Sequence, residues 1–152
     1  MQTPSPKGLH RHTRRHSLKI LLLLWALLAS APLFAVQLVA NPSVPETVLS
    51  PSTVRALFNM RLLQWPDGTP VRIYVLPDGN ALHRQFCKRY LGVFPHQLRY
   101  SWNRKVFSGM GQFPQQVKSV EEMRQRIADT PGAIGYLPEE LIDESVRAIE
   151  VE

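Results

Sequence analysis

Four stretches of the chain carry the apolar or alternating pattern that is typical of β-strands. Val36–Ala40 begins with alternating apolar and polar residues, and Val71–Leu76 continues the alternation for longer. Ala133–Leu137 is a short apolar run, and Val146–Val151 has the composition of a returning strand. We therefore predict one strand in each stretch.

Helical spacing of apolar residues predicts four helices between these strands. Ser50 followed by Pro51 is a typical helix start, because the serine side chain caps free N–H groups and proline suits the first helical position. A third helix is predicted over Pro95–Phe107, and Ser119 with Glu122 forms a capping box before the fourth. The apolar faces expected to be buried are Val54-Leu57-Phe58, Leu82-Phe86-Tyr90, Leu98-Trp102-Val106 and Val120-Met123-Ile127.

Turn-forming residues separate these elements. Asn41–Pro45, Trp65–Pro70 and Pro77–Asn80 are rich in Pro, Gly, Asn and Asp, and Ser108–Pro114 has the composition of a flexible connector. Pro138–Ile142 is expected to form a helical turn. Strands that alternate with helices indicate an α/β layer fold, and the sequence contains no internal repeat.

The amino terminus has the order of a secretory signal. Residues 1–19 contain five basic residues and no acidic one, and Ile20–Leu28 is a continuous apolar run. The small residues 29–31 follow directly. A basic start, an apolar centre and small residues are typical of an export signal. We therefore predict that about the first 35 residues direct export and that the remainder forms one domain.

Several alternatives for this segment remain open. Cleavage after Ala31 would place Pro32 beyond the cut, which leaves Ala35 or Ala40 as the better positions. Ile20–Ala40 comprises 21 residues, enough for an uncleaved membrane anchor. Residues 13–19 also resemble a twin-arginine export motif, although four consecutive leucines favour the general secretory route.

Charge is distributed unevenly along the chain. The net charge of +6 comes mostly from the first 19 residues, and residues 36–152 carry 13 basic and 12 acidic residues. This balance argues against a nucleic-acid partner. Between Gly79 and Val120 there are seven basic residues and no acidic one, whereas nine acidic residues follow from Glu121 onward. The basic stretch is either attractive to anions or paired with the acidic segment across the fold.

The residue types that carry catalysis or bind metals are sparse. Cys87 is the only cysteine, so no intramolecular disulfide is expected. His83 and His96 have no cysteine or carboxylate at ligand spacing, which argues against a metal site. Ser108 lacks an evident His and carboxylate partner, and residues 109–111 lack the third glycine of a dinucleotide-binding loop. We therefore predict a protein without catalytic residues, metal or cofactor.

The best candidate for a binding site is the turn Asp78-Gly79-Asn80. It lies between a predicted strand and a predicted helix, where backbone N–H groups at the helix start favour anions. In open α/β sheets, ligands also bind at the carboxyl ends of strands. The same three residues are also what an ordinary turn with a helix cap requires, and the sequence alone favours that interpretation over an anion site.

Four motifs, in order along the chain, resemble the second half of substrate-binding proteins of phosphate ABC transporters. They are Asn41–Ser43, Leu57–Met60, Trp65–Gly68 and Thr130–Tyr136, of which the Pro-Gly-Ala-Ile-Gly-Tyr run is the most specific. The resemblance implies a type II periplasmic-binding-protein fold over residues 36–152, reduced to a single lobe with a mixed sheet flanked by helices. It also makes residues 36–40 the first strand, which favours cleavage after Ala35.

The resemblance implies a modified ligand site. Asp78 and Gly79 match the Asp-Gly element that contacts phosphate in the family. The family's arginine position corresponds to Leu76, and its Ser-Gly-Thr run corresponds to Asn80–Leu82. A single lobe cannot enclose a ligand by hinge closure. We therefore expect weak binding of phosphate or another anion at Asp78–Asn80, with Arg84 as a helper one turn further on.

The resemblance further implies a periplasmic protein that works with an ABC permease or a membrane sensor. The alternative is an interaction module without transport activity, which has lost ligand binding. Such a module would form a homodimer or dock on a membrane sensor, because a lobe without its partner lobe exposes an apolar face.

Overall fold

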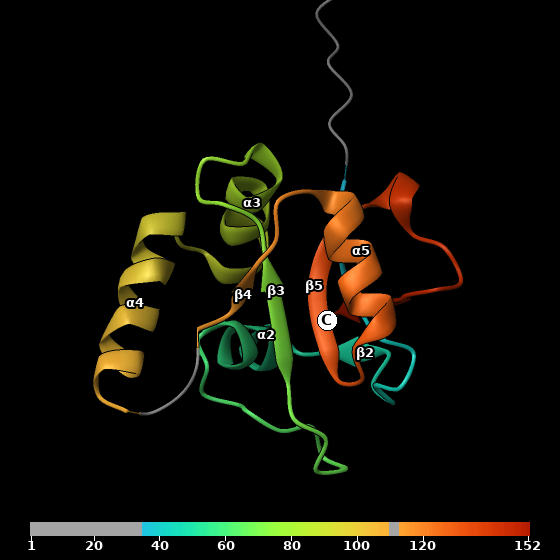
Figure 1. Cartoon of the computed structure of the whole chain (residues 1–152), viewed down its shortest axis with the longest axis horizontal. Helices are drawn as coiled ribbons and strands as arrows, with labels where there is room; N and C mark the ends of the chain where they lie inside the picture. Colours follow the sequence, from blue (N-terminus) through green and yellow to red (C-terminus); the bar gives the residue numbers. More distant parts are fainter. Residues whose placement is uncertain (1–34, 110–112) are drawn as a thin grey trace, which may run out of the picture. The chain divides into compact units, whose positions relative to one another are not determined.

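Six strands form one mixed sheet in the order β2-β6-β1-β5-β3-β4 (Figure 1). This computed structural model describes residues 35–109 and 113–152, so the predicted signal segment lies outside the described residues, as does the middle of the predicted connector. The strands are β1 (Val36–Ala40), β2 (Val48–Leu49), β3 (Arg72–Val75), β4 (Gln115–Gln116), β5 (Ala133–Pro138) and β6 (Arg147–Val151).

The predicted strands occupy the middle of this sheet. β1 pairs antiparallel with β5 on one side, where Leu38 faces Tyr136, and with β6 on the other, where Leu38 faces Ile149. β3 runs parallel to both β5 and β4, and β2 runs parallel to β6. The sheet is therefore mixed, as the resemblance implies, and its four longer strands confirm the sequence prediction.

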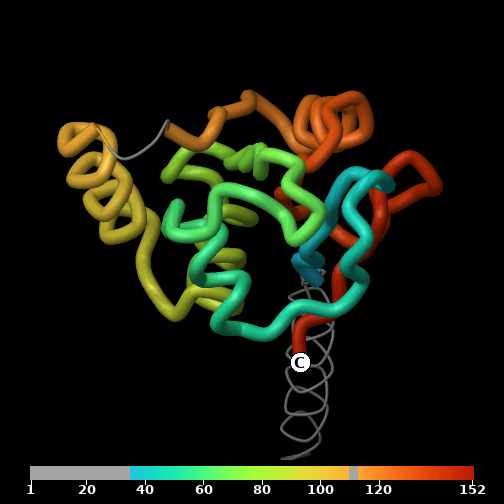
Figure 2. The backbone as a smooth tube through the Cα atoms, turned by 90° about the horizontal axis from the view of Figure 1, so that it is seen from below, coloured from blue at the N-terminus to red at the C-terminus, as the bar shows by residue number. Residues whose placement is uncertain are grey.

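Helices cover both faces of the sheet. Figure 2 shows α5 and the teal segment of α2 on opposite sides of it, and Figure 1 places α4 beside the edge strand β4. The helical elements are α2 (Pro51–Phe58), α3 (Ala81–Phe86), the π-helical turn η1 (Cys87–Leu91), α4 (Pro95–Phe107), α5 (Val120–Asp129) and the 3-10 turn η2 (Glu139–Leu141).

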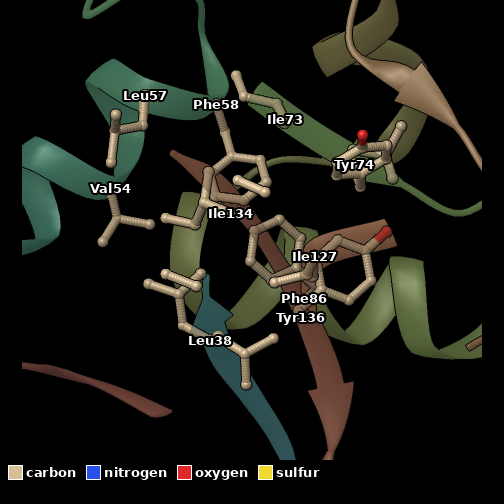
Figure 3. Close-up of a cluster of buried hydrophobic side chains, with 14 of the residues drawn as sticks. Leu38, Val54, Leu57, Phe58, Ile73, Tyr74, Phe86, Ile127, Ile134 and Tyr136 are labelled. Atoms are coloured by element: carbon tan, nitrogen blue, oxygen red, sulfur yellow. The ribbon is translucent and has the colours of Figure 1, made fainter. Parts of the chain in front are cut away.

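Strand β5 separates two packed layers. Successive side chains of a strand point to opposite faces, and a Cβ at Gly135 would lie 2.7 Å from Ile127 Cδ1 of α5. On the other face, the ring of Tyr136 stacks on Phe86 with the centroids 4.1 Å apart, and Phe58 packs against Phe86 at 4.6 Å (Figure 3). All three aromatic side chains are fully buried. Burial of each contributes about 3 kcal/mol to the stability of the fold.

The second predicted helix differs from its expected form. We expected one α-helix with Leu82, Phe86 and Tyr90 buried, but the α-helix ends at Phe86 and continues as the π-helical turn. Leu82 and Tyr90 are only partly buried, whereas His83 and Cys87 are fully buried. The wider π-helical turn rotates the side chains that follow it, so a constant four-residue spacing does not describe the buried face.

The remaining helices match their predictions more closely. Ser50 caps α2 by accepting a hydrogen bond from the Thr53 N–H at 3.1 Å, and α4 has the predicted bounds. Only one of the two hydrogen bonds of the predicted capping box of α5 forms. Ser119 Oγ accepts from the Glu122 N–H, but the Glu122 carboxylate accepts from the Lys118 N–H instead of that of Ser119.

Among the described residues, none of the helices combines the length and the apolar character that crossing a bilayer requires. Residues 1–34, which hold most of the predicted signal or anchor segment, lie outside this part of the chain, whereas Val36–Ala40 forms β1.

Candidate functional site

The turn that joins β3 to α3 holds the residues singled out from the sequence. The Asn80 N–H donates to the Pro77 carbonyl at 2.9 Å, which closes the turn. Asn80 Oδ1 then accepts from the N–H groups of Leu82 at 2.8 Å and His83 at 3.3 Å. Asn80 is therefore the N-cap of α3, which accounts for an asparagine at this position.

Two arginines from different helices contact this turn, one at its backbone and the other at the Asp78 side chain. Arg84 of α3 donates to the Gly79 carbonyl at 2.6 Å. Arg99 of α4 donates to both carboxylate oxygens of Asp78, from Nε at 2.7 Å and from Nη2 at 2.9 Å. This paired geometry is the strong form of an arginine–carboxylate contact. The turn thus lies between two exposed guanidinium groups.

The ion pair changes the protonation of both partners. The hydrogen bonds from Arg99 lower the pKa of Asp78, against a smaller opposing effect of burial. The same contact raises the pKa of Arg99. Both groups are therefore charged at neutral pH, and the carboxylate is an acceptor only.

A buried polar chain lies behind the turn. His83 Nδ1 is 2.5 Å from the hydroxyl oxygen of Tyr136, and that oxygen accepts the Leu76 N–H at 2.9 Å. Because the tyrosine oxygen accepts from Leu76, its own proton is free for His83, which suits a neutral imidazole. Burial lowers the pKa of His83 to about 4, while Asp78, with Oδ1 at 3.8 Å from Nε2, acts in the opposite direction. His83 is thus neutral at pH 7.

Cys87 lies next to His83 but is unsuited to nucleophilic chemistry. Its sulfur is 3.6 Å from His83 Nε2, and the thiol is fully buried. Burial raises the pKa of Cys87 to about 12, so the reactive thiolate is not populated at neutral pH. Within residues 35–109 and 113–152, no group of three His, Cys, Asp or Glu side chains is arranged to hold a metal ion.

The structure brings the four sequence-predicted residues together and adds one. Asp78, Gly79 and Asn80 form the turn, and Arg84 contacts its backbone. Arg99, 21 residues from Asp78 along the chain, was not predicted as part of this site. Its only sequence signal was its place in the stretch that lacks acidic residues.

Leu76, at the position that corresponds to arginine in the family, cannot contact a ligand with its side chain. It is 1% exposed, and its N–H is already bonded to Tyr136. The two arginines at the turn therefore reach it from helices α3 and α4, not from the end of β3.

No family model matches the sequence, and no curated protein matches it. Solved structures do match the described fold. A structure described as a phosphate ABC transporter substrate-binding protein with bound phosphate, from Clostridium perfringens, aligns with a TM-score of 0.62 over 76% of this chain, at 16% identity. An ABC-type phosphate transport receptor from Vibrio cholerae aligns with a TM-score of 0.55 at 13% identity, also over 76% of this chain. PstS from Borrelia burgdorferi aligns with a TM-score of 0.58 at 12% identity, over 78% of this chain.

These alignments cover 44%, 45% and 47% of the three larger proteins. The chain thus spans less than half of each solved structure that it resembles. Its fold is that of a single lobe of the periplasmic-binding-protein type, and the low identity limits the comparison to fold.

Proposed function

We propose that this chain is an exported, non-enzymatic domain of the substrate-binding type that binds phosphate or a similar small anion weakly. The binding residues are Asp78, Gly79, Asn80 and Arg84, and Arg99 supports them. Residues 1–35 act as the export signal, with cleavage after Ala35 and a periplasmic location. Residues 36–152 form the binding domain, whose partner is an ABC permease or a membrane sensor.

The observation that carries this proposal is the convergence of Arg84 and Arg99 on one turn at the carboxyl end of β3. This is the end of a strand at which α/β folds bind ligands. The two guanidinium groups outnumber the single carboxylate of Asp78, so the turn carries a net positive charge. Among the described backbone contacts, the N–H groups of Gly79 and Ala81 have no acceptor, and they are available to an anion.

Asp78 gives the site a means of discrimination. Phosphate near neutral pH keeps at least one P–OH group, and a carboxylate accepts a hydrogen bond from it. Sulfate has no such proton and would be repelled. The open, single-lobed architecture leaves the ligand in contact with water, which limits the affinity to the millimolar range.

We expect Arg84→Gln to weaken the binding of inorganic phosphate by about five- to tenfold, because it removes one charge-assisted hydrogen bond at an exposed site. Asp78→Asn should instead reduce the preference for phosphate over sulfate. Titration calorimetry of the purified chain with each anion measures both effects.

Lys88→Gln is the matched control for this test, because it removes one exposed positive charge from the same basic stretch but outside the turn. Its affinity for phosphate should stay within about twofold of the original chain. An original chain that releases no heat with millimolar phosphate would contradict the binding proposal.

The second candidate function is an interaction module, and one observation favours it. Phe94, Tyr100 and Phe107 lie on or next to α4 and are 64%, 66% and 86% exposed. Exposed aromatic side chains of this size commonly mark partner surfaces. In this case the domain would form a homodimer or bind a membrane sensor through α4, without a ligand.

The two functions differ in their response to Phe107→Ser. A module that assembles through α4 should sediment as a dimer, and this change should shift it to the monomer, with the folded state unaffected because the side chain is exposed. Asp78→Asn should leave assembly unchanged. A monomer at all concentrations in analytical ultracentrifugation would contradict the homodimer.

A further inference from the structure

A second basic site lies along α4 from Tyr100 onward and does not include Arg99. A pocket of about 430 Å³ opens between the residues that follow α2 and the carboxyl-terminal half of α4. Its volume is within the range of small-molecule sites. The pocket is lined by Arg61, Tyr100, Ser101, Arg104, Lys105 and Ser108.

The charge of this pocket is uncompensated. Three of its six lining residues are cationic, and its described lining contains no carboxylate. The ion pairs found among the described residues involve Arg99, Arg124 and Arg126 but none of these three cations. Clustered like charges raise the free energy of a fold unless a counter-charge binds.

The fold holds Lys105 in place and brings Arg61 next to it. Lys105 is only partly exposed, and its Nζ donates to the carbonyl of Asn59 at the end of α2. The next residue, Met60, has a left-handed φ of 56°, and the Arg61 N–H donates to Ala56 at 2.8 Å. This tight turn directs the chain so that Arg61 lies beside α4. Burial lowers the pKa of Lys105, and the nearby charge of Arg61 lowers it further.

The helix dipole explains only part of this cluster. Basic residues are favourable in the last turn of a helix, which accounts for Arg104 and Lys105 in α4. Arg61 follows the carboxyl end of α2, so two separate helix ends bring three positive charges together without a counter-charge in the described lining. Ser101 and Ser108 also belong to the lining, and their hydroxyl groups donate to Asn59 Oδ1 at 3.2 Å and to the Lys105 carbonyl at 2.8 Å.

We propose that this pocket binds a small soluble oligophosphate, an anion with three or more negative charges. Three cations from two segments match several phosphate groups in one ligand, and the hydroxyl group of Tyr100 supplies a neutral donor. A single orthophosphate ion would fill only a small part of the volume. The site shares no residue with the Asp78 turn and does not depend on the function proposed for it.

The probe for this proposal is inorganic tripolyphosphate, titrated into the purified full chain. Arg61→Gln and Arg104→Gln each remove one exposed charge from the pocket, and each should weaken tripolyphosphate binding by about tenfold or more. Both side chains are exposed, so folding should be preserved, which circular dichroism verifies. The amide resonances of Ser101 and Ser108 should shift on addition of the probe.

The controls separate the two sites. Lys88→Gln and Arg84→Gln should leave tripolyphosphate binding within about twofold of the original, whereas Arg104→Gln should leave orthophosphate binding unchanged. The proposal is overturned if Lys88→Gln weakens binding as much as Arg104→Gln, because the effect is then one of overall charge. It is also overturned if only Arg84→Gln weakens it, or if the chain binds anionic vesicles but not tripolyphosphate.

Discussion

Replacement of Gly132 with alanine is expected to lower the free energy of unfolding by about 3 kcal/mol or more, for two additive reasons. Gly132 has a φ of 73°, a left-handed conformation that is costly for any residue with a Cβ. An added Cβ would also collide with the carbonyl oxygen of Pro70 and lie 2.8 Å from Thr69 Cγ2.

The surrounding contacts prevent Gly132 from moving away. Its carbonyl accepts hydrogen bonds from the indole of Trp65 at 2.9 Å and from the Arg72 N–H at 3.1 Å. Its own N–H donates to Ser43 Oγ at 3.1 Å. A shift of this backbone would break hydrogen bonds to three separate segments. The strain that an alanine introduces therefore cannot be relieved by a small movement of the backbone.

Urea denaturation of Gly132→Ala measures the loss, and Gly68→Ala is the matched control. Gly68 has a similar φ of 86° but open space around the position of a Cβ. Gly68→Ala should therefore lower the free energy of unfolding by only about 1 kcal/mol, which is the cost of the left-handed conformation alone. Equal losses of unfolding free energy in the two variants would contradict a contribution from the collision at Gly132.

Acidification is expected to remove about 2 kcal/mol of stability between pH 7 and pH 5, and about 3 kcal/mol by pH 4, through His83. The pKa of His83 is about 4 in the folded state, against an ordinary value of 6.5. Between these values the unfolded chain binds a proton that the folded chain does not. The contribution is therefore complete above pH 6.5 and is lost as the pH falls toward 4.

The groups around His83 determine this behaviour. Burial is the largest cause of the lowered pKa, the positive charge of Arg99 adds to it, and the carboxylate of Asp78 opposes it. Tyr136 and Cys87 contact the ring but remain neutral here, since burial raises the pKa of each. Asp78 titrates below its ordinary value of 3.8, outside the window of His83.

Urea denaturation at a series of pH values tests this prediction. His83→Gln should flatten the stability profile between pH 7 and pH 5, even though it lowers stability overall by disturbing Tyr136. His96→Gln, which changes an exposed histidine, should leave the profile as it is. A profile of the original chain that is flat over this range would contradict the assignment.

Sequence patterns predicted the central sheet because its residues obey simple rules. β1 and β5 lie in the middle, are buried on both faces and are correspondingly apolar. The edge strands were missed for the opposite reason. β4 consists of two exposed glutamines, and β2 is also only two residues long. Strands this short are defined by backbone pairing to a neighbour, and two residues are too few to show an alternating pattern.

The candidate site shows the same division. Asp78–Asn80 and Arg84 are close in sequence, so turn chemistry and helical spacing were enough to group them. Arg99 and Arg61 act through contacts between elements that depend on where α4 packs. That position is fixed by Trp102, whose indole donates to the Phe58 carbonyl at 2.7 Å. No local pattern encodes such a contact.

The arrangement of β1 has a consequence for the order in which the chain folds. Both neighbours of β1 in the sheet come about one hundred residues later in the chain. A chain that emerges from its amino-terminal end, at the ribosome or through a membrane channel, therefore presents β1 long before either strand that will pair with it. The sheet can close only when β5 and β6 have emerged. Until then β1 is an apolar strand without a partner in the chain, which exposes it to aggregation.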